Sequence, residues 1–388
     1  MQVRPHQQHA LDAMASKSKG QIIIPTGGGK TFIMIRDAAR QFEKGKQTVV
    51  VVAPRILLAR QLCEDFREEL DAKIFHCHSG FRGYQGGTDA AWIAQWHKHE
   101  SDFNRLIFTT YHSLHRLVEA GIMVDSIYFD EAHNSVQKNF IEAVDDFSLH
   151  AGRCYFFTAT PKHSLTPMRV GMNETDIFGE VICKVPAPKL VKEGYILPPK
   201  VKVYKNDILK KDEITFDVEC NQIIDNIDDH NTKKILVCAK STKQIVGLVG
   251  YEKFIDELKE RGYDYMYISS KTGAVINGEK VKREEFFETM RVWGEECNRK
   301  FVVLHHSILS EGINVKGLEA VLFLRSMDYI GISQTIGRVI RRGCANKTYG
   351  LVCIPVYSKV GISTARKVQA VVDTVFVQGQ PAISVVKR

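Results

Sequence analysis

A glycine-rich segment that ends in lysine and threonine is the first candidate for chemistry in this chain. It reads Ile24-Pro25-Thr26-Gly27-Gly28-Gly29-Lys30-Thr31 and lies between an apolar run and an amphipathic stretch. Glycines let backbone N–H groups turn inward around a polyphosphate, and the start of the following helix adds positive potential. Lys30 can then reach the outer phosphates, and the Thr31 hydroxyl can ligate Mg²⁺. The segment predicts a nucleotide site, with a structural glycine turn as the alternative because Ile24 stands where the general pattern has glycine.

Two adjacent carboxylates follow another apolar run. Asp130 and Glu131 come directly after residues 127–129. A carboxylate at the C-terminal end of a parallel strand points into the crevice where α/β sheets bind ligands. We therefore expect Asp130 to hold Mg²⁺ and Glu131 to orient and deprotonate the water that attacks a phosphoanhydride. Alone, such a pair is typical of a solvated turn, but together with the glycine-rich segment it favours hydrolysis of a nucleoside triphosphate.

A downstream basic segment supplies the cation that this reaction needs. It reads Gln334-Thr335-Ile336-Gly337-Arg338-Val339-Ile340-Arg341-Arg342. Arg338 and Arg341 are three residues apart, so on a helix they share one face. A planar guanidinium can donate two hydrogen bonds to a phosphate, and an arginine finger is worth roughly 10³–10⁵ in rate. The alternative is a basic helix face in solvent.

Apolar runs alternate with helical stretches along the chain, which is typical of parallel α/β sheets. Prolines at positions 186, 188, 198 and 199 cluster near the middle. Because proline interrupts helices and central strands, we predict a linker over 186–200 between domains at 1–185 and 201–388. The predicted strands span residues 21–24, 48–53, 72–76, 105–109, 126–130 and 154–158 in the first domain, and 200–204, 234–239, 263–268, 300–304, 320–324 and 350–354 in the second.

The composition, 44% hydrophobic and 25% charged over 388 residues, is that of an ordinary globular protein. No apolar run is long enough to span a bilayer and no signal peptide is evident, so we expect a cytoplasmic protein without a membrane partner. The net charge of +8 is compatible with a polyanion partner. The nine cysteines lack disulfide spacing, which predicts reduced, buried thiols. His76-Cys77-His78 has no second pair at zinc-site spacing, which disfavours a structural metal.

The order of these motifs resembles that of superfamily 2 helicases and translocases of the DExH type. Residues 130–133 have the family's DEAH spelling, residues 158–161 are similar to its motif III, and residues 334–341 fit QxxGRxxR of motif VI. Other segments resemble its adenine-recognition element (4–8) and motifs Ia (53–55), Ib (109–114), IV (237–241) and V (310–315). Within the family, residues 158–162, 190–199 and 339–340 resemble the group of DNA translocases that contains phage UvsW, XPB and RecG.

The resemblance implies an α/β fold of two tandem RecA-like parallel-sheet domains, with the ATP site in the cleft between them and ATP and Mg²⁺ as cofactors. Asn314 stands where many members have aspartate, which weakens its assignment. The implied catalytic residues are Lys30, Asp130, Glu131, Gln334, Arg338 and Arg341. The implied nucleotide contacts are Arg4, Gln7, Thr26, Gly27, Gly28, Gly29, Lys30, Thr31, Gly312 and Asn314, with Thr31 and Asp130 also at the metal. The expected nucleic-acid contacts, made to the phosphate backbone, are Arg55, Thr110, Tyr111, His112, Ser241 and Ser270.

The expected activity is ATP-dependent movement on, or unwinding of, single-stranded, duplex or branched DNA in recombination, repair or replication, by a monomeric motor. An RNA helicase, including one that unwinds RNA–DNA hybrids, remains an alternative, as does the motor subunit of a restriction-type nuclease complex. A nucleic-acid-binding protein with an inactive ATP site is disfavoured by the intact Lys30, Glu131 and Arg341. The glycine-rich residues 80–88 form either a loop that grips DNA or a solvated insertion.

Overall fold

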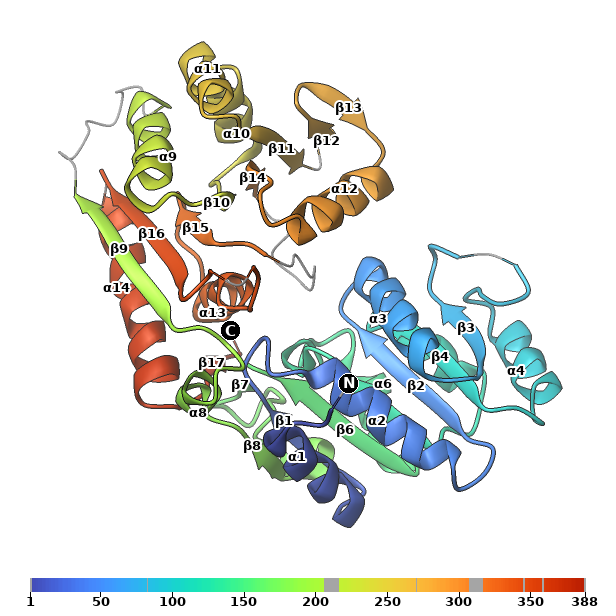
Figure 1. Ribbon diagram of the computed structural model, residues 1–388. Coiled ribbons are helices and arrows are strands. Elements are labelled where there is room, and N and C mark those ends of the chain that lie inside the picture. Colours follow the sequence, from blue (N-terminus) through green and yellow to red (C-terminus); the bar gives the residue numbers. More distant parts are fainter. Residues whose placement is uncertain are drawn as a thin grey trace. The chain divides into compact units, whose positions relative to one another are not determined.

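The computed structural model describes residues 2–81, 83–205, 216–269, 271–306, 317–344, 346–357 and 359–386. The chain divides into two compact units (Figure 1). One comprises Met1–Pro186 with Pro381–Arg388, and the other comprises Ala187–Gln380. Each unit contains its own sheet with helices packed on it, so the predicted class of two parallel-sheet α/β domains is confirmed.

The first unit is built on a fully parallel seven-stranded sheet with the order β3-β4-β2-β5-β6-β1-β8. Its central strands are buried along their whole length because helices cover both faces. This is why their sequences are continuous apolar runs rather than alternating ones. The strands are β1 (Lys19–Ile23), β2 (Thr48–Ala53), β3 (Lys73–Cys77), β4 (Arg105–Thr110), β5 (Ser126–Phe129), β6 (Arg153–Thr158) and β8 (Val181–Lys184).

Two groups of helices pack on this sheet. Helices α1, α2 and α3 contact one another in turn, and so do α4, α5, α6 and α7. The second group encloses a core that includes Trp96, Phe129 and Phe156. The helices are α1 (Pro5–Ser16), α2 (Lys30–Phe42), α3 (Ile56–Glu69), α4 (Ala90–His99), α5 (Leu114–Glu119), α6 (Ile141–His150) and α7 (Thr175–Phe178), with the 3-10 turn η1 (Ala132–Asn134).

The second unit has an eight-stranded sheet with the order β13-β12-β11-β14-β10-β15-β16-β9. Strands β9, β10, β11, β14, β15 and β16 are parallel, whereas β12 and β13 extend one edge as an antiparallel hairpin. Its strands are β9 (Pro199–Lys205), β10 (Lys234–Cys238), β11 (Asp264–Ser269), β12 (Gly273–Ile276), β13 (Glu279–Val281), β14 (Phe301–His305), β15 (Ala320–Phe323) and β16 (Gly350–Val356).

Helices also form two groups in the second unit. Helices α9, α10 and α11 contact one another, while α13 and α14 contact each other and β16. Figure 1 shows these elements in yellow-green to red. The helices are α8 (Ala187–Lys192), α9 (Phe216–His230), α10 (Thr242–Val249), α11 (Glu252–Glu260), α12 (Arg283–Glu295), α13 (Tyr329–Val339) and α14 (Lys359–Val372), with the π-helical turn η2 (Asp373–Val377).

The residues predicted as a linker, 186–200, contain α8 and the start of β9. Pro199 is the first residue of β9, which lies at a sheet edge where a missing N–H is tolerated. The assignment of all of 201–388 to the second domain needs correction at its end. Strand β17 (Ser384–Val385) pairs with β7 (Lys162–His163) and so returns the chain to the first unit. A two-residue strand is too short to show a periodic pattern in the sequence.

Every strand predicted from an apolar run is present in the structure. Strands β8, β12 and β13 were not predicted, because they are only three or four residues long and lie at or near sheet edges, where a continuous apolar run is not required. Among the described residues, no helix is long and apolar enough to cross a bilayer.

The expectation that all cysteines are reduced is wrong at one place. Cys297 and Cys344 form a disulfide, although they are 47 residues apart in the sequence. The end of α12 and the segment after α13 meet there, and local spacing gives no sign of such a long-range approach. The other seven cysteines, from Cys63 to Cys353, are buried thiols outside any disulfide, as predicted.

Candidate functional site

The glycine-rich loop connects the end of β1 to the start of α2. Gly27 and Gly29 have φ angles of 85° and 86°, a backbone region that side chains with a Cβ rarely occupy. The Gly28 N–H donates to the Pro25 carbonyl at 3.0 Å, which closes the turn. Lys30 is the first residue of α2, and its Nζ is 3.4 Å from the Ile24 carbonyl oxygen. The N–H groups in the first turn of a helix have no intrahelical partners, so this loop offers donors for phosphate.

The predicted adenine-recognition element packs directly on this loop. Arg4 and Gln7 form a reciprocal cap at the start of α1, with the Arg4 N–H 2.9 Å from Gln7 Oε1. Gln7 is only 4% exposed, and a Cβ on Gly29 would come within 2.3 Å of its Nε2. Sequence reasoning missed His6, whose buried Nε2 is 2.8 Å from the Gly28 carbonyl oxygen. Its only signal in the sequence was its position beside Gln7.

The DEAH residues follow β5. Glu131 has a φ angle of 46°, which is uncommon for a residue other than glycine and turns the chain sharply after Asp130. His133 Nδ1 lies 3.6 Å from Glu131 Oε2 and 3.1 Å from the Thr158 hydroxyl. The Thr160 hydroxyl is 3.4 Å from the same nitrogen, and its N–H donates to Thr158 Oγ1. The histidine therefore connects the candidate base to the predicted motif III at the end of β6.

The oxygen ligands present fit Mg²⁺. Thr31 is the second residue of α2 and Asp130 directly follows β5; β6 alone lies between β1 and β5 in the sheet. Mg²⁺ is usually bound by one or two protein oxygens together with waters and substrate phosphates. Within the described residues, no cluster of three or more histidine, cysteine or acidic side chains could hold a metal by itself. These residues therefore suit an ion that binds with the nucleotide.

Helix α13 carries Gln334 and Arg338, which are 8% and 5% exposed. Arg338 lies near the end of β14, where its positive charge and that of Arg325 act on His305. Burial first, and then these two guanidinium groups, lower the pKa of His305 well below its ordinary value. The histidine is therefore neutral, with its Nε2 3.3 Å from the Cys238 sulfur.

The prediction that Arg341 shares a helix face with Arg338 is wrong. Helix α13 ends at Val339, and Ile340 caps it with an N–H donated to the Ile336 carbonyl at 3.2 Å. Arg341 lies beyond the helix, so helical spacing does not set its direction. The pattern QxxGRxxR has the period of a helix but gives no information on where the helix stops.

The predicted nucleic-acid contacts of the first unit lie at or just after the C-terminal ends of β2 and β4. Arg55 and His112 are exposed, whereas Thr110 is 3% exposed. The assignment of the Tyr111 side chain needs correction. It is 2% exposed in the core, and its hydroxyl donates to the Asp130 carbonyl at 2.9 Å. Burial, with the nearby Asp130 and Glu131 charges, raises the pKa of Tyr111, so the phenol supports the DEAH segment as a neutral donor.

In the second unit, the Ser241 side chain caps α10 by accepting the Gln244 N–H at 3.1 Å. Three predicted site residues, Ser270, Gly312 and Asn314, lie outside the described residues.

The glycine-rich loop after β3 is attached to that strand rather than extended into solvent. The Phe81 ring stacks on His76 at 4.8 Å, and the Gly87 N–H donates to the His76 carbonyl at 3.0 Å. Tyr84 is 49% exposed and bonds Glu100 at 2.8 Å. Arg82 lies outside the described residues.

Two family models match the chain in succession. Residues 1–163 match the model described as "Type III restriction enzyme, res subunit", and residues 219–343 match "Helicase conserved C-terminal domain". No curated protein matches the sequence at a significant level.

Solved structures share the fold at low sequence identity. The DNA-bound ATP-dependent Type ISP restriction-modification enzyme LlaBIII has a TM-score of 0.77 and 18% identity, with coverage of 100% of this chain and 31% of that one. A nuclease-deletion mutant of the Type ISP enzyme LlaGI, in complex with a DNA substrate mimic, has a TM-score of 0.67 and 19% identity, with coverage of 98% and 30%. Mss116p bound to single-stranded RNA and AMP-PNP has a TM-score of 0.66 and 15% identity, with coverage of 100% and 75%. The chain thus spans under a third of either restriction-modification enzyme.

Proposed function

We propose that this chain, which carries the paired domains of a superfamily 2 helicase, is a motor that hydrolyses ATP to move along duplex DNA. The helicase domains imply an ATP-hydrolysing enzyme. One observation carries the proposal further. His133 connects Glu131, the candidate base, to Thr158 and Thr160. A change at the γ-phosphate can therefore reach the end of β6 through the 3.6 Å contact of Glu131 with His133 and the hydrogen bond between His133 and Thr158.

The proposed reaction uses this chain's own groups as follows. Loop N–H groups and the Lys30 ammonium bind the phosphates, and Thr31 with Asp130 would hold Mg²⁺, which neutralises phosphate charge. Glu131 accepts a proton from water as the water oxygen bonds to the γ-phosphorus and the bond to the bridging oxygen breaks. Arg338 and Arg341 supply the positive charge that stabilises the transition state. Gln7 reads the adenine from its position against Gly29.

Duplex DNA is proposed as the track because two of the similar structures contain DNA or a DNA mimic. Arg55 and His112 are exposed at one edge of the first sheet and would contact the strand backbone. We further propose that the protein is related to the group of DNA translocases that contains UvsW, XPB and RecG. It would act as a monomeric motor in recombination, repair or replication. A restriction-type motor is the second candidate, because residues 1–163 match the res-subunit model.

Steady-state ATP hydrolysis tests the proposal. The rate would be measured with no nucleic acid, single-stranded DNA, duplex DNA, forked DNA and single-stranded RNA, with the Glu131→Gln variant as the blank. We expect the strongest stimulation by duplex or forked DNA. Strongest stimulation by RNA would move the protein to the RNA helicases, and no hydrolysis under any condition would refute the motor.

Movement is tested separately by displacement of a third strand from a DNA triplex, which requires translocation but no unwinding. We expect displacement that depends on ATP and is absent in Glu131→Gln. Hydrolysis without displacement would contradict translocation. A restriction-type role predicts that triplex displacement is strong while a forked duplex stays paired, whereas a repair role predicts that the fork is remodelled.

A further inference from the structure

Arg341 lies two residues beyond the end of α13, so the hydrogen bonds of that helix do not fix its backbone. Helix α13 ends at Val339, and the last carbonyls of a helix have no intrahelical partners. Two residues later the chain presents Arg341, which the proposed function places at the transition state. Its effect on the rate depends on placement, because a shift of about 1 Å in a charged group can cost roughly 10²-fold in rate. Some other group must therefore hold this segment.

The side chain of Lys347 meets this requirement. Its Nζ donates to the Val339 carbonyl at 2.5 Å, the Arg341 carbonyl at 2.8 Å and the Leu318 carbonyl at 2.6 Å. An ammonium has three N–H donors, and all three are used here. Two of the bonds join the carbonyl at the end of α13 to the carbonyl of Arg341 through the same ammonium. The third bond connects that ammonium to Leu318, at the start of the segment that leads into β15. A cation also suits the negative end of a helix.

We propose that Lys347 is a positioning residue that fixes the backbone of Arg341 relative to the end of α13 and to Leu318. The expected effect on the rate of ATP hydrolysis rests on the proposed function. The position of the Arg341 backbone does not, because it can be measured without ATP. The pattern QxxGRxxR ends before Lys347, so the motif does not include this residue.

The surroundings of the Lys347 ammonium show why it suits this task. Burial is the main cause that lowers its pKa to about 8, the positive charges of Lys234 and Arg341 lower it further, and Glu319 opposes them. An ammonium in such a place is costly unless carbonyls surround it. Below about pH 8 it keeps three donors, whereas the neutral amine keeps only two, so one carbonyl must lose its bond.

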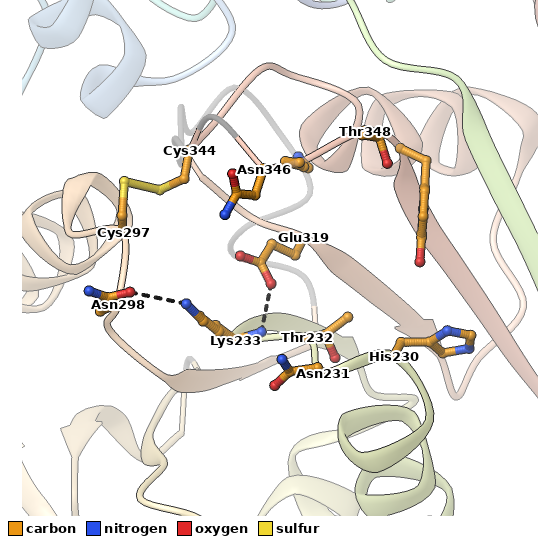
Figure 2. A pocket seen from close by; sticks show the side chains of 12 residues that line it. His230, Asn231, Thr232, Lys233, Cys297, Asn298, Glu319, Cys344, Asn346 and Thr348 are labelled. Atoms are coloured by element: carbon orange, nitrogen blue, oxygen red, sulfur yellow. Dashed lines mark hydrogen bonds between the residues drawn. A yellow bond between two sulfur atoms is a disulfide. The ribbon is translucent and has the colours of Figure 1, made fainter.

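The loop that carries Lys347 is fixed by neighbouring contacts. Cys344 is joined to Cys297 at the end of α12, as Figure 2 shows beside Asn346 on the same loop. A Cβ on Gly317 would come within 2.2 Å of the Gly294 carbonyl oxygen, and Lys234 Nζ donates to that same oxygen at 2.7 Å. Backbone segments therefore approach closely around the Lys347 ammonium.

A cavity of about 450 Å³ gives water access to this region. Lys347 lines it. Glu319, Lys233 and Asn298 also line it, as Figure 2 shows. Water in the cavity can exchange protons with the Lys347 ammonium. The activity should therefore respond to pH if the ammonium positions Arg341.

The test compares Lys347→Met with Lys233→Met. Lys233 lines the same cavity, but its Nζ bonds the Asn298 side chain at 3.1 Å and, within the described part of the chain, no carbonyl near α13. We expect Lys347→Met to lower kcat for ATP hydrolysis roughly 10- to 100-fold with little change in KM, because the lost contribution is made in the transition state. Lys233→Met should keep both constants within about twofold of the parent. A folded Lys347→Met variant with normal kcat, or one with a raised KM alone, would overturn the inference.

Two further measurements keep the inference testable if Lys347→Met folds poorly or the parent lacks hydrolysis. In the parent protein kcat should fall as the pH rises through about 8, since the third donor is lost; a flat profile to higher pH would count against it. In Lys347→Met, the amide hydrogens of residues 340–344 should exchange about tenfold faster or more. Unchanged exchange would refute the positioning, whereas faster exchange in a protein without hydrolysis would refute only the proposed function.

Discussion

A buried ion pair connects helices α1 and α2 to the first sheet, and its removal has a calculable effect. Arg153 on β6 donates to both carboxylate oxygens of Asp37 on α2, at 2.6 and 2.9 Å, and to the Met14 carbonyl on α1 at 3.0 Å. Tyr128 also donates to Asp37 at 2.6 Å. The side chains of Arg153 and Asp37 are 16% and 2% exposed.

Replacing Arg153 by methionine leaves the Asp37 carboxylate buried with Tyr128 as its remaining partner on this network. Removal of one partner of a buried pair costs about 3–5 kcal/mol, because the other charge stays desolvated and unpaired. With an m-value of about 2 kcal/mol/M, this loss would lower the urea midpoint of the first unit by roughly 2 M. The loss should fall well below 3 kcal/mol in the double variant Asp37→Leu/Arg153→Met, since no charge is then stranded.

The assay is urea unfolding followed by tryptophan fluorescence in a Trp293→Phe background. The chain has three tryptophans, and the remaining two, Trp92 and Trp96, both lie on α4 of the first unit. The matched control is Arg116→Met, which breaks the exposed pair of Arg116 with Glu119 at 2.8 Å. Such a surface pair is worth about 0.2–1 kcal/mol. A loss below about 1 kcal/mol for Arg153→Met, equal to that of the control, would refute the reasoning.

Three other predictions follow from the structure. Glu131→Gln should bind ATP as the parent does but lose turnover, as measured by nucleotide titration and phosphate release; near-normal turnover would remove Glu131 from the base role. Burial lowers the pKa of His78 to about 4, below its unfolded value. Stability from neutral His78 is therefore complete above about pH 6.5 and falls by about 3 kcal/mol as the pH approaches 4. His78→Leu should flatten this part of the unfolding free energy against pH, and an unchanged slope would contradict the assignment. Reduction of Cys297–Cys344, or Cys297→Ser, should lower the stability of the second unit by about 2–4 kcal/mol, since the two cysteines are 47 positions apart in the sequence; urea midpoints that do not respond to reductant would argue against the bond.

Much of the sheet architecture could be predicted because buried parallel strands carry their own signal. Strands β2, β4 and β5 are covered on both faces, so each is a continuous apolar run that can be recognised without a partner. The glycine-rich loop and the DEAH residues follow such strands directly. The sequence therefore predicted that both segments lie at the end of a strand. It also indicated their chemistry, because that depends on residue type and spacing.

Other features depend on residues that are distant along the chain. Contact between His133 and Thr158 crosses 25 residues, and the bond from Lys347 to Leu318 crosses 29. Tyr111 has the sequence context of a nucleic-acid contact, yet packing turns its ring into the core. The periodicity of the sequence does not predict such long-range contacts, because each contact depends on how several helices and strands pack together.

Local sequence patterns were enough to predict the two α/β domains, the glycine-rich loop, the paired carboxylates and the arginine-rich segment, because such patterns specify strands, turns and residue chemistry. Three features became visible in the folded chain alone. Helix α13 ends before Arg341, the Lys347 side chain bonds the Val339 and Arg341 carbonyls beyond that end, and His133 connects Glu131 to Thr158. These features depend on partners that folding brings together from separate segments, because a helix end, a buried ammonium and a chain of polar side-chain contacts must all find their partners elsewhere in the sequence.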